Sequence, residues 1–265
     1  MSTDFYIIVI GAGIAGASVA AHLAETHGVC VLEMEERPAY HTTGRSAATY
    51  EPNYGPPAIC ALTRASRREY DAGGFLSPRE ALFLMPDGQQ AAFEAVMAGQ
   101  KGMSEISAAE GKARFPLLRD GYARRVILDP GTADIDVGLL HQSYLKLFKQ
   151  RGGTLVCDAP VTALEKSSGW TVTAAGQTFR ARIVVNAAGA WGDHVAELAG
   201  KRRTGLKPKR RSIAVVPVPD GMNVMDWAMA IDCAETWYCK PSRESFLFHP
   251  PMPHRLSRMM PMPMT

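Results

Sequence analysis

The chain has 265 residues, of which 46% are hydrophobic and 21% charged, and its formal net charge is +3. This composition excludes a wholly disordered chain and a coiled coil, and the length allows a sizeable core in one or two domains. The small net charge gives no indication of a nucleic-acid partner. The longest apolar run, 5–24, is interrupted by His22 and by glycines and has no basic segment before it. We therefore expect no stable membrane insertion and no signal peptide.

The first elements predicted along the chain form a βαβ unit. Residues 5–11 are continuously apolar and β-branched, which is typical of a strand buried on both faces of a parallel sheet. A helical stripe follows and stops near Gly28, and residues 29–35 predict a second buried strand. The whole unit takes about thirty residues, as a βαβ motif requires.

A glycine-rich turn joins the first strand to the helix. Gly11, Gly13 and Gly16 match GxGxxG, in which the glycines permit a tight turn, a close approach of pyrophosphate and close packing of helix on strand. Glu33 ends the second predicted strand, where a carboxylate binds the ribose hydroxyls and disfavours a 2′-phosphate, and hence NADP. The predicted dinucleotide-binding residues here are Gly11, Gly13, Ile14, Ala15, Gly16, Glu33 and Met34.

The remaining elements predict a doubly wound α/β domain interleaved with a smaller mixed-sheet domain. We expect helices over 57–70 and 137–152, the second N-capped by Asp134 or Asp136, and a hairpin around Ala175-Gly176. Antiparallel strands are expected within 212–219 and 236–248. The predicted domains are 1–75 with 134–205 for the dinucleotide, 76–133 with 206–248 for the substrate, and a disordered tail at 249–265.

Downstream segments favour FAD over NAD. GRSAA follows the βαβ unit at the spacing of a second flavin-contacting segment, and RIVVNAAGAW is a strand that runs into a turn of small residues. Val161 lies in a predicted strand whose backbone could bind the adenine. These segments add Gly44, Arg45, Ser46, Ala47, Ala48, Val161, Ala188, Gly189 and Trp191 to the predicted cofactor site.

Five motifs in order carry a family resemblance: GAGIAGASVA, HTTGRSAA, GTADIDVGLLHQSYL, VVNAAGAW and GLKPKRRS. From about residue 4 to 248 the chain resembles the FAD-dependent D-amino-acid oxidase and dehydrogenase (DAO) superfamily, and within it most closely the D-arginine dehydrogenases. The resemblance implies that FAD takes a hydride from the α-carbon of a D-amino acid, and that water hydrolyses the imino acid to a 2-oxo acid and ammonia. A glycine- or sarcosine-oxidase-like activity is the alternative within enzymes. The electron acceptor stays open.

The resemblance also implies substrate residues. Arg211 matches the cation that lines the substrate site, although it belongs to a run of seven basic residues that could equally be a solvated surface. Tyr54 and Tyr238 match tyrosines that close over the substrate. Two positions depart from the family: Thr49 replaces a histidine near the reactive flavin edge, and Ala81 replaces the acid that receives a basic substrate side chain. Strict D-arginine preference is therefore not expected.

The five cysteines form no CxxC pair and are odd in number. We interpret them as reduced thiols in a cytoplasmic protein. No group of His, Cys and Asp has the spacing of metal ligands, so no metal is expected.

The resemblance stops at Phe248, and the last sixteen residues contain five Met and five Pro. Family members continue for roughly a hundred residues with parts of the flavin and substrate sites, so we expect the chain to be incomplete. A one-base shift after Phe248 can encode Ser-Pro-Ala-Asp-Ala-Ala, which resembles the family's continuation and indicates a frameshift. An inactive fragment with weak FAD retention is the non-enzyme alternative.

Overall fold

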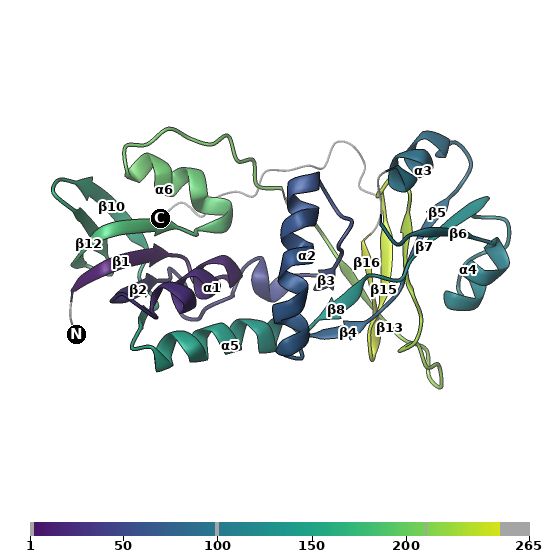
Figure 1. Ribbon diagram of the computed structural model, residues 1–265, viewed down its shortest axis with the longest axis horizontal. Helices are drawn as coiled ribbons and strands as arrows, with labels where there is room; N and C mark the ends of the chain where they lie inside the picture. The colour runs from purple at the N-terminus through teal and green to yellow at the C-terminus, as the bar shows by residue number, and fades with distance from the viewer. Residues whose placement is uncertain (1–2, 99–100, 210, 250–265) are drawn as a thin grey trace. The chain divides into compact units, whose positions relative to one another are not determined.

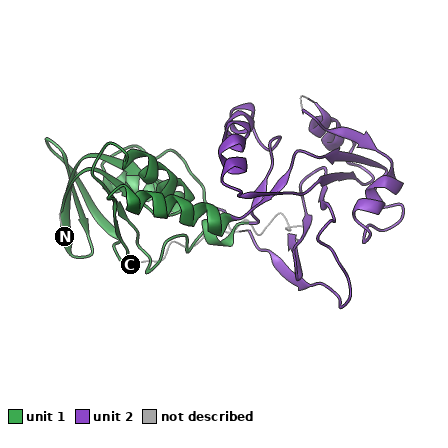
Figure 2. Cartoon of the chain, turned by 60° about the horizontal axis from the view of Figure 1, so that its bottom comes forward, with its two compact units in different colours: residues 1–46, 137–208, 259–265 green, residues 47–136, 209–258 purple. Residues whose placement is uncertain are grey.

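The computed structural model describes residues 3–98, 101–209 and 211–249. The predicted disordered tail, 249–265, lies outside this range except for His249, which is buried and pairs with Tyr238 at the end of a strand, so the ordered sheet extends one residue past the predicted start of the tail. The chain divides into two units (Figure 2). Unit 1 contains Met1–Ser46 and Val137–Pro208, and unit 2 contains Ala47–Asp136 and the described residues from Lys209 onward. The observed division thus falls after Ser46 rather than after residue 75, which gives unit 2 a larger share of the chain than the sequence predicts.

Unit 1 is built on a six-stranded sheet with the order β10-β11-β12-β1-β2-β9 (Figure 1). Strands β12, β1, β2 and β9 are parallel, while β10 and β11 form an antiparallel extension. The strands are β1 (Asp4–Ile10), β2 (Val29–Leu32), β9 (Thr154–Val156), β10 (Val161–Lys166), β11 (Trp170–Ala174) and β12 (Gln177–Asn186). The helices are α1 (Ile14–Leu23), α5 (Val137–Gln150) and α6 (Gly192–Leu198).

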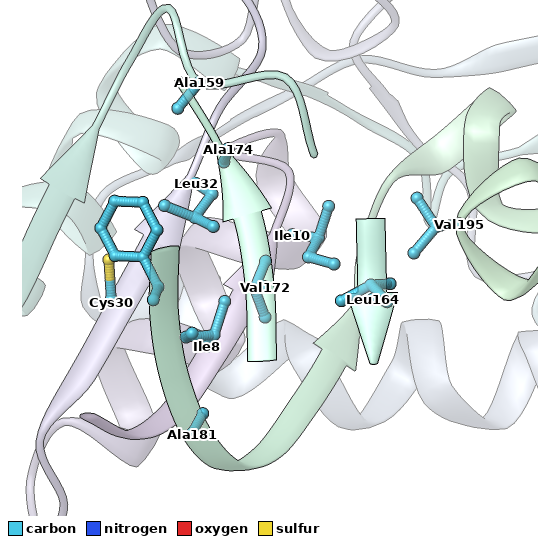
Figure 3. Close-up of a cluster of buried hydrophobic side chains, with 11 residues drawn as sticks. Ile8, Ile10, Cys30, Leu32, Ala159, Leu164, Val172, Ala174, Ala181 and Val195 are labelled. Atoms are coloured by element: carbon cyan, nitrogen blue, oxygen red, sulfur yellow. The ribbon is translucent and has the colours of Figure 1, made fainter. Parts of the chain in front are cut away.

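Both faces of the central strands are buried, which explains why β1 and β2 read as continuous apolar runs. Figure 3 shows Ile8, Ile10, Cys30 and Leu32 on one face, packed with side chains of β10 and β11 and with Val195 of α6. Strand geometry sends the alternate residues to the other face, where α1 and α5 pack against each other (Figure 1). The sheet therefore has layers on both sides.

Unit 2 holds a seven-stranded mixed sheet with the order β13-β16-β15-β14-β5-β7-β6 and a three-stranded sheet with the order β3-β8-β4. Among the described strand pairs of the large sheet, β14–β5 is parallel and the others are antiparallel. The strands of the large sheet are β5 (Ala81–Met85), β6 (Ser104–Ile106), β7 (Arg125–Asp129), β13 (Ala214–Pro217), β14 (Met229–Asp232), β15 (Tyr238–Pro241) and β16 (Ser245–His249). The small sheet has β3 (Thr49–Tyr50), β4 (Leu76–Pro78) and β8 (Ala133–Ile135), and the helices are α2 (Pro57–Ala72), α3 (Gln90–Met97) and α4 (Ala108–Arg114).

Most predicted elements are confirmed. Helix α2 covers the predicted 57–70, α5 begins directly after Asp136, and the β11–β12 hairpin turns at Ala175 and Gly176, both of which have positive φ. The predicted second strand is shorter than expected: β2 ends at Leu32 instead of residue 35. After Leu32 the backbone bonds the segment that follows β9, with Ala159 N donating to Glu33 O. Within the described ranges, no helix is both long and apolar enough to span a bilayer.

Candidate functional site

The turn between β1 and α1 depends on two glycines. Gly11 has a φ of +100°, a conformation that side chains disfavour, and a Cβ there would lie 2.6 Å from the carbonyl oxygen of Ala187. A Cβ on Gly16 would lie 1.8 Å from the carbonyl oxygen of Gly11, so the first turn of α1 packs directly on the strand end. At both glycines one backbone segment therefore packs directly against another, as the GxGxxG pattern predicts.

Side chains from distant segments fix the peptide groups of this turn. Ala12 N donates to Glu33 Oε2 at 2.7 Å, and Ala12 O lies 2.9 Å from Nε2 of His141, a buried residue of α5. Ile14 N donates to Thr43 Oγ1 at 3.0 Å. The buried carboxylate of Glu33 therefore supports the turn, while the ribose role predicted for it stays a prediction.

The N-terminus of α1 is suited to an anion. Its N-cap, Gly13, provides no side-chain acceptor, and the first turn contains no acidic residue. Gly13 and Ile14 are half-buried and Ala15 is exposed, so a ligand can approach this turn. Ile14 N is engaged by Thr43, but the dipole of the helix start and the N–H groups of the rest of its first turn favour a phosphate.

The other cofactor candidates of unit 1 lie around the same strand ends. Gly44 and Arg45 belong to the short 3₁₀ helix η1 (Thr43–Arg45), whose Thr43 bonds the turn. Ala188 lies directly before the 3₁₀ helix η2 (Gly189–Trp191), which follows β12, and Ala187 contacts Gly11. Val161 opens β10, and Met34 follows Glu33. Ser46 ends this part of unit 1, whereas Ala47 and Ala48 belong to unit 2.

An aromatic group lies beside the turn region. The rings of His41 and Trp191 are 4.6 Å apart, and His41 Nε2 lies 2.7 Å from Glu35 Oε1. Because Glu35 N also donates to Glu33 Oε1 at 3.1 Å, the contacts link Trp191 to the carboxylate of Glu33. His41, Thr43 and His141 lie within the motifs HTTGRSAA and GTADIDVGLLHQSYL, but the sequence analysis gave them no role, because their partners lie far away along the chain.

The substrate candidates all belong to unit 2. Tyr54 lines a cavity of about 40 Å³, together with Glu51, Asn53, Phe83, Asp129 and Glu235. Within it, Asn53 donates to Asp129 Oδ2 at 2.9 Å and accepts from Arg64 at 2.6 Å. Asn53 and Asp129 are therefore already engaged with protein groups, whereas no hydrogen bond to the side chain of Glu51 or Glu235 is found in the described part of the chain.

Electrostatic interactions connect this cavity to Arg211 and Tyr238. Burial raises the pKa of Tyr238, and the charge of Arg211 opposes that shift while Glu51 adds to it. Burial also raises the pKa of Glu235, again opposed by Arg211. Burial, with Glu235 and Asp129 nearby, raises the pKa of Glu51 to about 7. The structure thus brings Tyr54, Arg211 and Tyr238 into one neighbourhood that also contains two carboxylates the sequence analysis missed.

The two departures from the family pattern also lie in unit 2. Ala81 is fully buried in an apolar cluster with Phe83 and Ile127, and its neighbour Glu80 accepts from Arg114 at 3.0 Å. Glu80 is therefore engaged by an arginine of its own unit. Thr49 begins β3, where its hydroxyl lies 3.5 Å from Ala47 O. No group of His, Cys, Asp and Glu in the described ranges could hold a metal ion.

Comparison with known proteins gives the family. A family model described as FAD dependent oxidoreductase (DAO) matches residues 7–255, nearly the whole chain. The chain belongs to this family. The predicted cofactor, FAD, and the predicted α/β fold class are thereby confirmed. The glycine turn, the start of α1 without acidic side chains and the Glu33 carboxylate fit the close backbone approach and the polar groups that FAD requires.

Individual relatives are distant. L-2-hydroxyglutarate dehydrogenase from Bos taurus is 25% identical over 83% of this chain and 56% of its own length. Dimethylglycine dehydrogenase from Homo sapiens is 25% identical over 92% of this chain and 30% of its own. The chain thus spans about half or less of the curated relatives that it matches.

Solved structures share the fold. L-α-glycerophosphate oxidase from Mycoplasma pneumoniae, with FAD bound, has a TM-score of 0.83 at 16% identity, covering 94% of this chain and 71% of that one. L-proline dehydrogenase from P. horikoshii has a TM-score of 0.79 at 20% identity, covering 94% and 70%. Their identities are too low to carry more than the architecture.

Glu33→Ala should weaken FAD binding by about 10- to 100-fold, because a hydrogen bond to a charged group contributes about 1.5–3 kcal/mol. The variant loses the acceptor of Ala12 N and, if the predicted role is right, the acceptor for the ribose hydroxyls. Quenching of flavin fluorescence during titration measures the change, with the exposed Glu36→Ala as the matched control. Unchanged flavin affinity, or tight NAD binding without flavin, would contradict the assignment.

Proposed function

We propose that this chain provides the flavin and substrate sites of an FAD-dependent oxidation of a D-amino acid or a close amine analogue to a 2-oxo acid and ammonia. The observation that carries the proposal is the grouping in unit 2: Arg211 and Tyr238 interact electrostatically with the carboxylates that line the cavity beside Tyr54. A cation, two phenols and two carboxylates are the complement of a zwitterionic substrate.

Each group has a role in this proposal. Arg211 binds the substrate carboxylate, while Tyr54 and Tyr238 donate hydrogen bonds and exclude water. Glu51 faces the amine, and a carboxyl whose pKa is about 7 can accept a proton from the substrate ammonium near neutral pH. FAD, when bound, supplies the hydride acceptor. Water then hydrolyses the oxidised product.

The names of the relatives support the substrate class. L-2-Hydroxyglutarate, dimethylglycine, L-proline and glycine all carry a C–H bond next to a carboxylate, so the names support a small carboxylate substrate and not its configuration. A cation such as Arg211 is the feature that such substrates require in common. A glycine- or sarcosine-oxidase-like oxidation is the second candidate, favoured by the small volume of the cavity.

The proposal is tested by purifying the chain and recording its absorbance spectrum, then assaying a panel of D-amino acids, glycine and sarcosine with an artificial dye and with oxygen. We expect flavin bands and oxidation of neutral D-amino acids. Because Ala81 offers no charge to a basic side chain, D-methionine should compete well with D-arginine. A many-hundredfold preference for D-arginine contradicts this specificity. Absence of flavin and of turnover favours the inactive fragment.

Glu51→Gln should stabilise the protein at pH 8 and leave it unchanged near pH 4. The pKa of Glu51 rises from 4.5 to about 7 on folding, so the folded state binds the proton more tightly than the unfolded state does. Ionised Glu51 therefore costs the folded protein up to about 3 kcal/mol above pH 7, and this cost disappears as the pH falls to 4.5. Urea unfolding at several pH values measures the difference.

The exposed Glu244→Gln provides the control, for which no pH-dependent gain is expected. If the stability difference between Glu51→Gln and the parent does not change with pH, the Glu51 carboxyl does not have the raised pKa that its buried, acidic surroundings imply. The same variant also reports on the proposed proton transfer, because it should lower kcat/KM on amine substrates at neutral pH.

A further inference from the structure

A buried lysine binds the backbone of the segment predicted to contact the flavin. Lys240 lies on β15, and its side chain is 6% exposed. Its Nζ donates to Ala47 O at 2.6 Å and to Ala48 O at 2.9 Å. The same atom lies 2.9 Å from Asp134 Oδ1, which makes an ion pair. All of these residues belong to unit 2.

Asp134 also makes a second ion pair, with Arg79. Arg79 Nε donates to Asp134 Oδ2 at 2.7 Å, and Arg79 also donates to Trp227 O at 2.5 Å. A buried ammonium is costly unless it is paired and hydrogen-bonded. Burial lowers the pKa of Lys240, and the charge of Asp134 opposes that shift. Asp134 thus joins two buried cations, one of which reaches the backbone of Ala47 and Ala48.

The backbone that Lys240 binds is in an unfavourable conformation. Ala48 has a φ of +56°, in the left-handed region that residues with a Cβ avoid. Besides the lysine, Ala48 O accepts a hydrogen bond from Ile135 N at 2.9 Å. Strained backbone of this kind persists only where surrounding contacts impose it.

We propose that Lys240 is a positioning residue for the flavin, a role that rests on the proposed function. The peptide unit is planar, so fixing the carbonyls of Ala47 and Ala48 also fixes the direction of the N–H groups of Ala48 and Thr49. Among the N–H groups whose direction is fixed in this way, that of Thr49 is the donor that the segment can offer to an acceptor atom of a flavin ring. Lys240 sets its orientation before FAD binds, which reduces the ordering that binding requires.

The test compares Lys240→Met with Asp134→Asn in the full chain. Both variants disrupt the buried ion pair, but only the first removes the hydrogen bonds to Ala47 and Ala48. We expect Lys240→Met to weaken FAD binding by at least about tenfold, to alter the visible spectrum of the bound flavin, and to accelerate amide hydrogen exchange at Ala48 and Thr49 in the apoprotein by at least about tenfold. Asp134→Asn should change each value by less than about threefold.

Two outcomes overturn the proposal: unchanged flavin affinity and exchange in Lys240→Met, or equal losses in Asp134→Asn, which would indicate general destabilisation. If Lys240→Met does not fold, Lys240→Gln takes its place, because its amide keeps N–H donors but no charge, and a smaller loosening of Ala48 and Thr49 is then expected. If the parent chain binds no FAD, the proposed function fails, and hydrogen exchange in the apoprotein alone decides whether Lys240 holds the segment.

Discussion

Gly16→Ala is expected to abolish FAD binding. The added Cβ would lie 1.8 Å from the carbonyl oxygen of Gly11 and 2.9 Å from its carbonyl carbon. Both are backbone atoms, so no side chain can rotate away, and α1 must move from the end of β1. Overpacking of this kind costs about 1–3 kcal/mol in a core, and displacement of the phosphate-binding turn adds to it. We expect FAD affinity to fall on the order of 100-fold or more.

Gly28→Ala is the matched control, because a Cβ at Gly28 meets nothing within 4 Å. Both variants add one methyl group to unit 1, so a difference between them reports on the turn. Flavin titration and thermal unfolding should be measured together. Equal flavin affinity in the two variants would show that the turn does not hold the pyrophosphate.

Arg211→Met should raise the KM for amino-acid substrates by about 10- to 100-fold with a much smaller change in kcat. The substrate carboxylate loses a charge-assisted hydrogen bond of about 1.5–3 kcal/mol in both the ground state and the transition state. Removal of such uniform binding reduces turnover at low substrate far more than at saturation. Steady-state kinetics on the substrate identified by the panel measure the effect.

Lys207→Met is the control for this variant, because Lys207 is an exposed cation of the same basic run. If the basic run is only a solvated surface, both variants should change KM by the same small amount, and added salt should reduce that change. If Arg211→Met binds the substrate with normal apparent affinity, Arg211 is not part of the substrate site. A group other than Arg211 would then have to bind the substrate carboxylate beside Tyr54 and Tyr238.

The cofactor turn could be predicted because its determinants are local. The continuous apolar runs of the two strands, the spacing of Gly11, Gly13 and Gly16, and the acid after the second strand all lie within about thirty residues, the length of one βαβ unit. Because connections between parallel strands are short, few topologies are possible, and the preference for a right-handed crossover selects among them. The β11–β12 hairpin was predictable for the same reason, since Ala175 and Gly176 alone determine its turn.

The contacts around these motifs depended on pairings that no local pattern specifies. His141 reaches Ala12 across 129 positions, and Lys240 reaches Ala47 across 193. The boundary after Ser46 was missed because β3 pairs with β8, so the segment that follows joins unit 2. Glu51 and Glu235 line one cavity from opposite ends of that unit's sequence. The amino-acid sequence by itself predicted the glycine-rich turn, because local sterics and the strand and helix patterns around it fix this feature, while the family and FAD followed from the resemblance carried by five motifs in order. Only the tertiary structure determined which buried charges hold that backbone in place, because a buried charge is stable only beside partners that folding brings to it.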